Sequence, residues 1–278
     1  MTKLKKINKK KFFYSFVQGR FSSEVAGKFQ HFPIHNWENE FNIAKKFNFD
    51  SIEWIITDFS NPIFNQSFSK IIKNVLKKNK MKISSISMDI IMDNALHKLS
   101  LKETRWLSEY LLKAIKYFDI KRVSIPIEER SRFNNAFEKK LALNNLNLIY
   151  QKLNNHCKIC IETDLSPASL IEIFKLKKFK KLGLLLDLGN TRAHGFKVED
   201  YFNLYCDKIY SIHIKYRDKS YGKTKIINEK SFHELEYVIN NLKKLNNLVD
   251  ISFQTFKTDK YFLANMKKSI KSFNNYVK

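Results

Sequence analysis

The segment Lys158–Phe179 reads KICIETDLSPASLIEIFKLKKF and contains one strand–helix unit. The apolar run Lys158–Glu162 has the length of a strand, and strands covered by protein on both faces are almost continuously apolar. Ser166 fits the N-cap of a helix and Pro167 fits its first position, so a helix is expected to begin there. The strand stops at Glu162, a residue able to bind a metal.

The same alternation of a short apolar run and a longer amphipathic stretch recurs along the whole chain. Further strands are predicted at Phe12–Val17, Ser51–Ile55, Lys82–Ser87, Arg122–Pro126, Gly183–Asp187, Ile209–His213 and Asp250–Gln254. Helices are predicted near Trp37–Phe47, Ser67–Asn79, Glu103–Phe118, Phe137–Asn154, Pro167–Phe179, Val198–Cys206, Phe232–Leu245 and Tyr261–Tyr276.

Eight strand–helix units without a linker predict an α/β fold, a single (β/α)8 TIM barrel, with residues 1–278 as one domain. The alternative is a doubly wound open sheet. That fold usually has a glycine-rich turn after its first strand, and Val17–Phe21 is not such a turn.

Four successive predicted strands stop at residues able to bind a metal. They lie in the segments KICIETD, LGLLLDLGN, KIYSIHIKYR and VDISFQT, and the residues are Glu162, Asp187, His213 and Gln254. Three oxygen ligands and one nitrogen ligand suit one divalent ion, Mn, Mg, Co, Zn or Fe. In a barrel, chemistry gathers where the strands end. Polar residues stand at the other strand ends too: Gln18, Arg20, Glu53, Asp89 and Glu128.

At these residues the chain resembles the sugar isomerase/epimerase superfamily of xylose isomerase-like barrels, which also includes the apurinic endonuclease IV group. The similarity runs nearly from end to end. The motifs that carry it are GRFS at Gly19–Ser22, FPIHNWENEF at Phe32–Phe41, FDSIEWI at Phe49–Ile55, IETDL, LDLGN, HIKYR and FQT.

The resemblance implies that Glu162, Asp187, His213 and Gln254 bind one divalent metal. It also implies an isomerase or epimerase that acts on a small sugar, sugar phosphate or sugar acid. In epimerases of the superfamily the first and last of these positions are both glutamates that exchange protons with the sugar. Gln254 can donate a carbonyl oxygen to a metal, but it cannot act as a base.

Glu162 is therefore the expected base, and the second proton carrier has to lie elsewhere, at Lys215, Glu53 or Asp89. His213, Lys215 and Arg217 alternate along a strand end and share a face. Two cations beside a metal would suit an anionic substrate, although both could instead pair with local carboxylates. The residues expected to contact substrate are Glu53, Asp89, Arg217 and Gln18.

The formal net charge of +24 invites a nucleic-acid interpretation. However, the basic residues are 44 lysines and 7 arginines spread along the chain, without the arginine clusters and stacking aromatics of nucleic-acid surfaces. An endonuclease IV-like enzyme remains an alternative, although that group uses many histidines and this chain has 7. A non-catalytic barrel that has lost its second base is another.

The chain contains no apolar run long enough for a membrane span and no secretory signal, so a cytoplasmic location is expected. Whether the barrels pair into a homo-oligomer is left open. Cys157 and Cys160 form a lone CxxC pair without a second pair, and both are expected to be structural.

Overall fold

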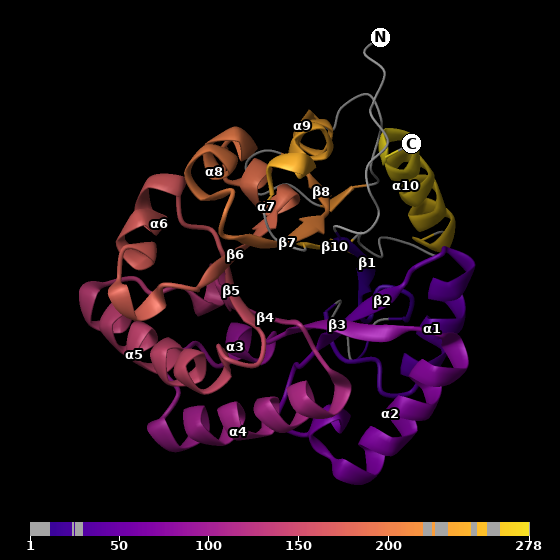
Figure 1. Ribbon diagram of the computed structural model, residues 1–278, viewed down its shortest axis with the longest axis horizontal. Coiled ribbons are helices and arrows are strands. Elements are labelled where there is room, and N and C mark those ends of the chain that lie inside the picture. Colours follow the sequence, from indigo (N-terminus) through magenta and orange to yellow (C-terminus); the bar gives the residue numbers. More distant parts are fainter. Residues whose placement is uncertain are drawn as a thin grey trace.

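The computed structural model is a closed barrel of eight parallel strands surrounded by helices (Figure 1). It describes residues 12–23, 25, 30–218, 224–225, 233–245, 249–254 and 262–277. Phe232 and Tyr261, the predicted first residues of the last two helices, lie outside the described residues. Thr255 of the FQT motif also lies outside them.

The barrel strands confirm the predicted order, with ends shifted by one residue in places. They are β1 (Phe12–Val17), β2 (Ser51–Ile55), β3 (Lys82–Ser87), β4 (Arg122–Ile127), β5 (Lys158–Thr163), β6 (Gly183–Asp187), β7 (Ile209–Ile214) and β10 (Val249–Phe253). Each strand pairs with its neighbour in sequence, and β10 closes the ring on β1. The doubly wound alternative is therefore excluded.

Most of the helices cover the outside of the barrel. They are α1 (Trp37–Lys46), α2 (Gln66–Asn79), α3 (Ile90–Asp93), α4 (Leu101–Phe118), α5 (Ala136–Leu153), α6 (Pro167–Phe174), α7 (Leu188–Ala193), α8 (Val198–Tyr205), α9 (His233–Asn241) and α10 (Phe262–Val277). Among the described helices none is long and apolar enough to cross a membrane.

Local signals set the helix starts. Ser166 caps α6 by accepting a hydrogen bond from the Ser169 N–H, with Pro167 in the first turn as predicted. Ser100 and Glu103 form a capping box at the start of α4. The predicted helix to Phe179 instead ends at Phe174, and a separate 3-10 turn follows at Lys177–Phe179.

Two short helices, α3 and α7, and a small antiparallel ribbon interrupt the regular alternation. The ribbon pairs β8 (Tyr216–Arg217) with β9 (Thr224–Lys225). Both helices lie at the mouth where the strands end: α7 begins directly after β6, and two residues separate α3 from the end of β3.

The main hydrophobic core lies between the barrel and the helices, with residues such as Phe16, Trp54 and Leu111 completely buried. The barrel interior is different. Small hydroxyls and charged groups point into it, and contacts such as Arg122 on β4 with Asp250 on β10 cross the ring. The near-continuous apolar strands expected from the sequence are thus apolar mainly on their helix-facing side.

Candidate metal centre

The four residues predicted to bind a metal stand at one mouth of the barrel. Glu162, Asp187 and His213 come from β5, β6 and β7, which are neighbours in the ring. One ligand atom from each lies within 4.8 Å of the other two, and all three residues are buried. Gln254 follows β10, and its backbone N–H donates to the Ile214 carbonyl at 3.1 Å, which holds it beside β7.

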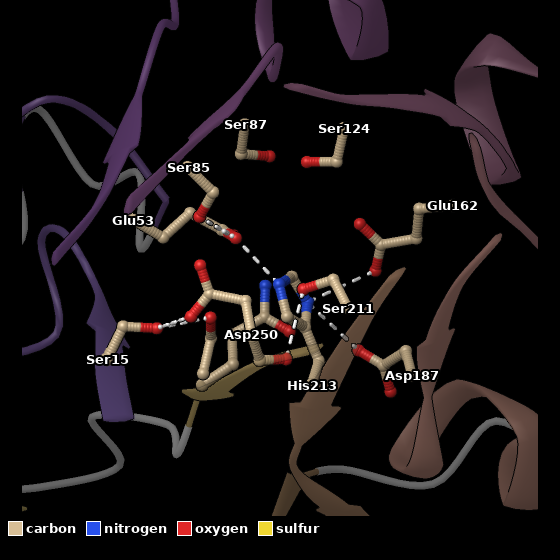
Figure 2. Close-up of polar contacts among 12 residues, drawn as sticks. Ser15, Glu53, Ser85, Ser87, Ser124, Glu162, Asp187, Ser211, His213 and Asp250 are labelled. Atoms are coloured by element: carbon tan, nitrogen blue, oxygen red, sulfur yellow. Dashed lines mark hydrogen bonds and ion pairs between the residues drawn. The ribbon is translucent and has the colours of Figure 1, made fainter. Parts of the chain in front are cut away.

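His213 is held between two groups of carboxylates (Figure 2). Its Nε2 lies 2.8 Å from Glu53 Oε1, while its Nδ1 lies 3.6 Å from Glu162 Oε1 and 3.7 Å from Asp187 Oδ2. Burial lowers the pKa of His213. The negative charges of Glu53 and Glu162 raise it by more, so the net pKa is well above its usual value. The geometry therefore points Nδ1 toward Glu162 and Asp187.

Glu53 lies behind His213, on the side away from Glu162 and Asp187. It is 0% exposed, and its Oε2 accepts a hydrogen bond from Ser85 Oγ at 2.8 Å. Burial raises the pKa of Glu53, but His213 outweighs this, and the net pKa is below its usual value. This placement favours support of His213 over the substrate contact expected from the sequence.

Asp187 is fixed by the helix that follows it. Its Oδ1 accepts a hydrogen bond from the Asn190 N–H at 2.7 Å and so caps α7. Its Oδ2 is 2.8 Å from Lys215 Nζ. Burial raises the pKa of Asp187, but Lys215 and His213 lower it below its usual value. Gly189 permits this approach, because a Cβ there would lie 2.9 Å from the Lys215 carbonyl oxygen.

Two glutamates of the mouth have raised pKa values. Burial raises the pKa of Glu162, and the negative charge of Asp187 raises it too. The positive charge of His213 lowers it by less, so the net pKa is raised. Glu128 follows β4, and burial together with the Glu162 charge raises its pKa well above its usual value. Its Oε2 accepts a hydrogen bond from Asn190 Nδ2 at 2.9 Å. The sequence indicated Glu128 only as one polar strand end among several.

The other predicted substrate contacts are distributed around the mouth. Gln18 is buried and its Oε1 accepts from the Ile55 N–H at 3.3 Å. Asp89 is buried, with its Oδ1 accepting from Ser87 Oγ at 2.6 Å. Arg217 Nη1 donates to Asn190 Oδ1 at 2.7 Å. These three side chains are thus each held by protein groups.

Two further residues complete the mouth. Arg20 is buried, and burial lowers its pKa. The carboxylates of Asp89 and Asp187 raise the pKa by less, so the net pKa is lowered. Gln30 bridges Arg20 and Asp89 through its amide. Arg20 was identified from the sequence only as a strand-end residue, and Gln30 gave no signal because it lies outside any strand or helix.

The donor set fits a divalent ion. Within the described part of the chain, His213 Nδ1 and Gln254 Oε1 are buried and have no hydrogen-bond partner. A buried polar atom without a partner is costly, and a cation beside it removes that cost. Two carboxylates, an imidazole nitrogen and an amide oxygen are ligands of Mg, Mn, Co, Fe and Zn.

Replacement of Glu53 by Gln is expected to weaken metal binding by about 10- to 100-fold. The variant replaces the charged acceptor at His213 Nε2 by a neutral amide, whose oxygen is a weaker acceptor and which no longer fixes the tautomer of the ring. Calorimetric titration with Mn²⁺ measures the effect, and Glu172→Gln, at an exposed position of α6, serves as the matched control. Equal Mn²⁺ affinities of the parent and the Glu53 variant would contradict this role.

Neither a protein-family model nor a curated protein matches the chain. Solved structures do match it. A xylose isomerase-like TIM barrel protein from Mycobacterium smegmatis, in complex with magnesium, is 14% identical with a TM-score of 0.69, covering 96% of this chain and 98% of the other. D-psicose 3-epimerase with D-tagatose from Clostridium cellulolyticum is 8% identical with a TM-score of 0.69, covering 96% of this chain and 100% of the other.

A third similar structure is the probable 3-DHS dehydratase AsbF from Bacillus anthracis. It is 16% identical with a TM-score of 0.70, covering 95% of this chain and 99% of the other. These comparisons show that the chain has the xylose isomerase-like TIM barrel fold that the sequence resemblance implied. Because one fold hosts different reactions, the function has to be argued from the site.

Proposed function

We propose that this protein is a divalent-metal-dependent isomerase or epimerase that acts on a small sugar or a sugar derivative. The observation that carries the proposal is the convergence of Glu162, Asp187 and His213 within 4.8 Å at the barrel mouth. The fold is shared with a sugar epimerase and with a barrel solved in complex with magnesium.

The residues that would hold the metal are Glu162, Asp187, His213 and Gln254. A divalent ion bound there would polarise a carbonyl oxygen and so acidify the neighbouring C–H bond. Lys215, through its contact with Asp187 Oδ2, reaches the same side of the mouth.

Glu162 is the group best placed to take the proton from carbon. Its carboxylate is buried at the end of β5, beside the residues that would hold the metal, and a carboxylate in that position can accept a proton from the substrate carbon. Gln254 has no basic group, so the proton has to return from another residue. Lys215 and Glu128 are the two candidates that lie around Glu162, and both interact with it electrostatically.

Cations at the mouth would suit an anionic substrate, such as a sugar phosphate or a sugar acid, although Lys215 and Arg217 also lie beside the carboxylates of Asp187 and Glu129. Arg20 is buried there, and Lys215 has a side chain that is 12% exposed. Arg217 Nη1 lies 3.6 Å from Glu129 Oε1 and also donates a hydrogen bond to Asn190 Oδ1. Guanidinium and ammonium groups are the usual partners of phosphate and carboxylate.

Deuterium exchange tests the proposal. The Mn²⁺-loaded protein is incubated in D₂O with ketoses, ketose phosphates and keto sugar acids, and NMR follows the hydrogens next to the carbonyl. The proposal expects exchange and isomerisation or epimerisation with at least one substrate class. A protein that neither binds metal nor promotes exchange would contradict it and favour a non-catalytic barrel.

The net charge of +24 is the one feature that favours an endonuclease IV-like enzyme. Against it, the described residues contain a single group of three candidate metal ligands, and only one of the three is a histidine. The endonuclease IV group uses many histidines. Duplex binding that depends on an abasic lesion and falls steeply with salt would support that alternative.

A further inference from the structure

Gln254 can offer a metal either of two chemically different ends. Its amide has a carbonyl oxygen, which binds cations, and an NH₂ group, which repels them. A glutamate at this position has two equivalent oxygens and no such problem. A site that contains Gln254 therefore needs something to decide which end faces the metal.

The described structure contains a group that can fix which end of the Gln254 amide faces the metal. Gln254 Nε2 lies 3.4 Å from the Oε1 of Gln30, while Gln254 Oε1 is buried without a hydrogen-bond partner among the described residues. Because Gln30 Oε1 is an acceptor only, it selects the NH₂ end of Gln254. The carbonyl oxygen then points away from Gln30.

The amide of Gln30 is itself oriented by two charged residues. Arg20 Nη2 donates to Gln30 Oε1, and a guanidinium has donors only. On its other side, Gln30 Nε2 donates to Asp89 Oδ2, whose carboxyl is also held by Ser87. Exchanging the two ends of the Gln30 amide would break both contacts, so the network of donors and acceptors fixes its orientation.

We infer that Gln30 is a positioning residue of the metal centre. Held between Arg20 and Asp89, it keeps the Gln254 amide turned so that Oε1 serves as the metal ligand. The inference rests on the metal site of the proposed function, and it explains how a glutamine can stand at a ligand position.

Replacement of Gln30 by Met tests this role, because methionine has a similar length and no amide. The probe is Co²⁺, its affinity is measured by calorimetry, and its visible absorption reports the ligand set. Gln30→Met is expected to weaken Co²⁺ binding about tenfold, the low end of effects seen for residues that orient metal ligands. Gln151→Met, at an exposed glutamine of α5, is the matched control and is expected to bind as the parent does.

Introducing Gln30→Met into the Gln254→Glu variant distinguishes a role in orienting the Gln254 amide from a general disturbance of the barrel mouth. In Gln254→Glu the two carboxylate oxygens are equivalent, so Gln30→Met is expected to cause no loss of Co²⁺ affinity. An equal loss in both backgrounds, or no loss in the parent background, would overturn the positioning role while leaving the metal site intact. If the parent protein binds no Co²⁺, the proposed function fails together with the inference.

Discussion

Replacement of Glu162 by Gln is expected to slow proton exchange at the substrate carbon by about 10²- to 10⁴-fold, the contribution typical of a positioned general base. The variant keeps an oxygen that can bind the metal but loses the group that accepts the proton. The rate of deuterium incorporation from D₂O, measured by NMR on any substrate that the parent turns over, gives the effect.

Two controls make this prediction specific to the base. Co²⁺ titration should show that Glu162→Gln still binds the metal, and Glu109→Gln, at an exposed position of α4, should exchange as fast as the parent. If Glu162→Gln retained metal and exchanged at the parental rate, Glu162 could not be the base.

Replacement of Arg122 by Met is expected to lower the free energy of unfolding by about 3–5 kcal/mol. Arg122 is 2% exposed inside the barrel, where its Nη1 lies 3.5 Å from Asp250 Oδ2 and its Nε donates to the Tyr210 carbonyl at 2.8 Å. Without Arg122, the carboxylate of Asp250 stays buried with no cation opposite it. Urea unfolding curves of the parent and the variant measure the loss.

A second substitution tests the cause. Asp250→Asn removes the charge and keeps an oxygen that can accept from Ser15 Oγ, which lies 2.7 Å from Asp250 Oδ1. The double variant should therefore recover much of the stability lost in Arg122→Met. Arg105→Met, at an exposed position of α4, should change stability by less than about 0.5 kcal/mol. A double variant less stable than Arg122→Met alone would show that the buried charge is not the cause.

The barrel strands and their order could be predicted from the sequence because each strand is a short apolar run between amphipathic helices. The short helices α3 and α7 could not, because four and six residues are too few for an apolar stripe to repeat. The cross-barrel contacts were also beyond sequence reasoning. Glu53 and His213 are 160 residues apart, and only ring closure brings them to 2.8 Å.

The convergence of Glu162, Asp187 and His213 could be predicted because carboxyl ends of parallel strands meet at one mouth of a barrel. The surrounding residues were harder. Glu128 was indistinguishable from other polar strand ends, because its burial beside Glu162 depends on how the strand ends converge. Gln30 belongs to an irregular segment, where side-chain periodicity predicts nothing.

Metal content tests the central claim most directly. The parent protein, Asp187→Ala and His213→Ala are dialysed against Mn²⁺ and then against buffer, and mass spectrometry gives the metal bound per chain. Because Mg²⁺ is held weakly, melting temperatures with added Mg²⁺, Mn²⁺, Co²⁺ and Zn²⁺ complete the measurement. We expect about one ion per chain and a metal-dependent rise in melting temperature in the parent, both lost in the two variants. A parent protein that neither retains nor is stabilised by any of these ions, or variants that bind as the parent does, would contradict a metal centre at the ends of β5, β6 and β7.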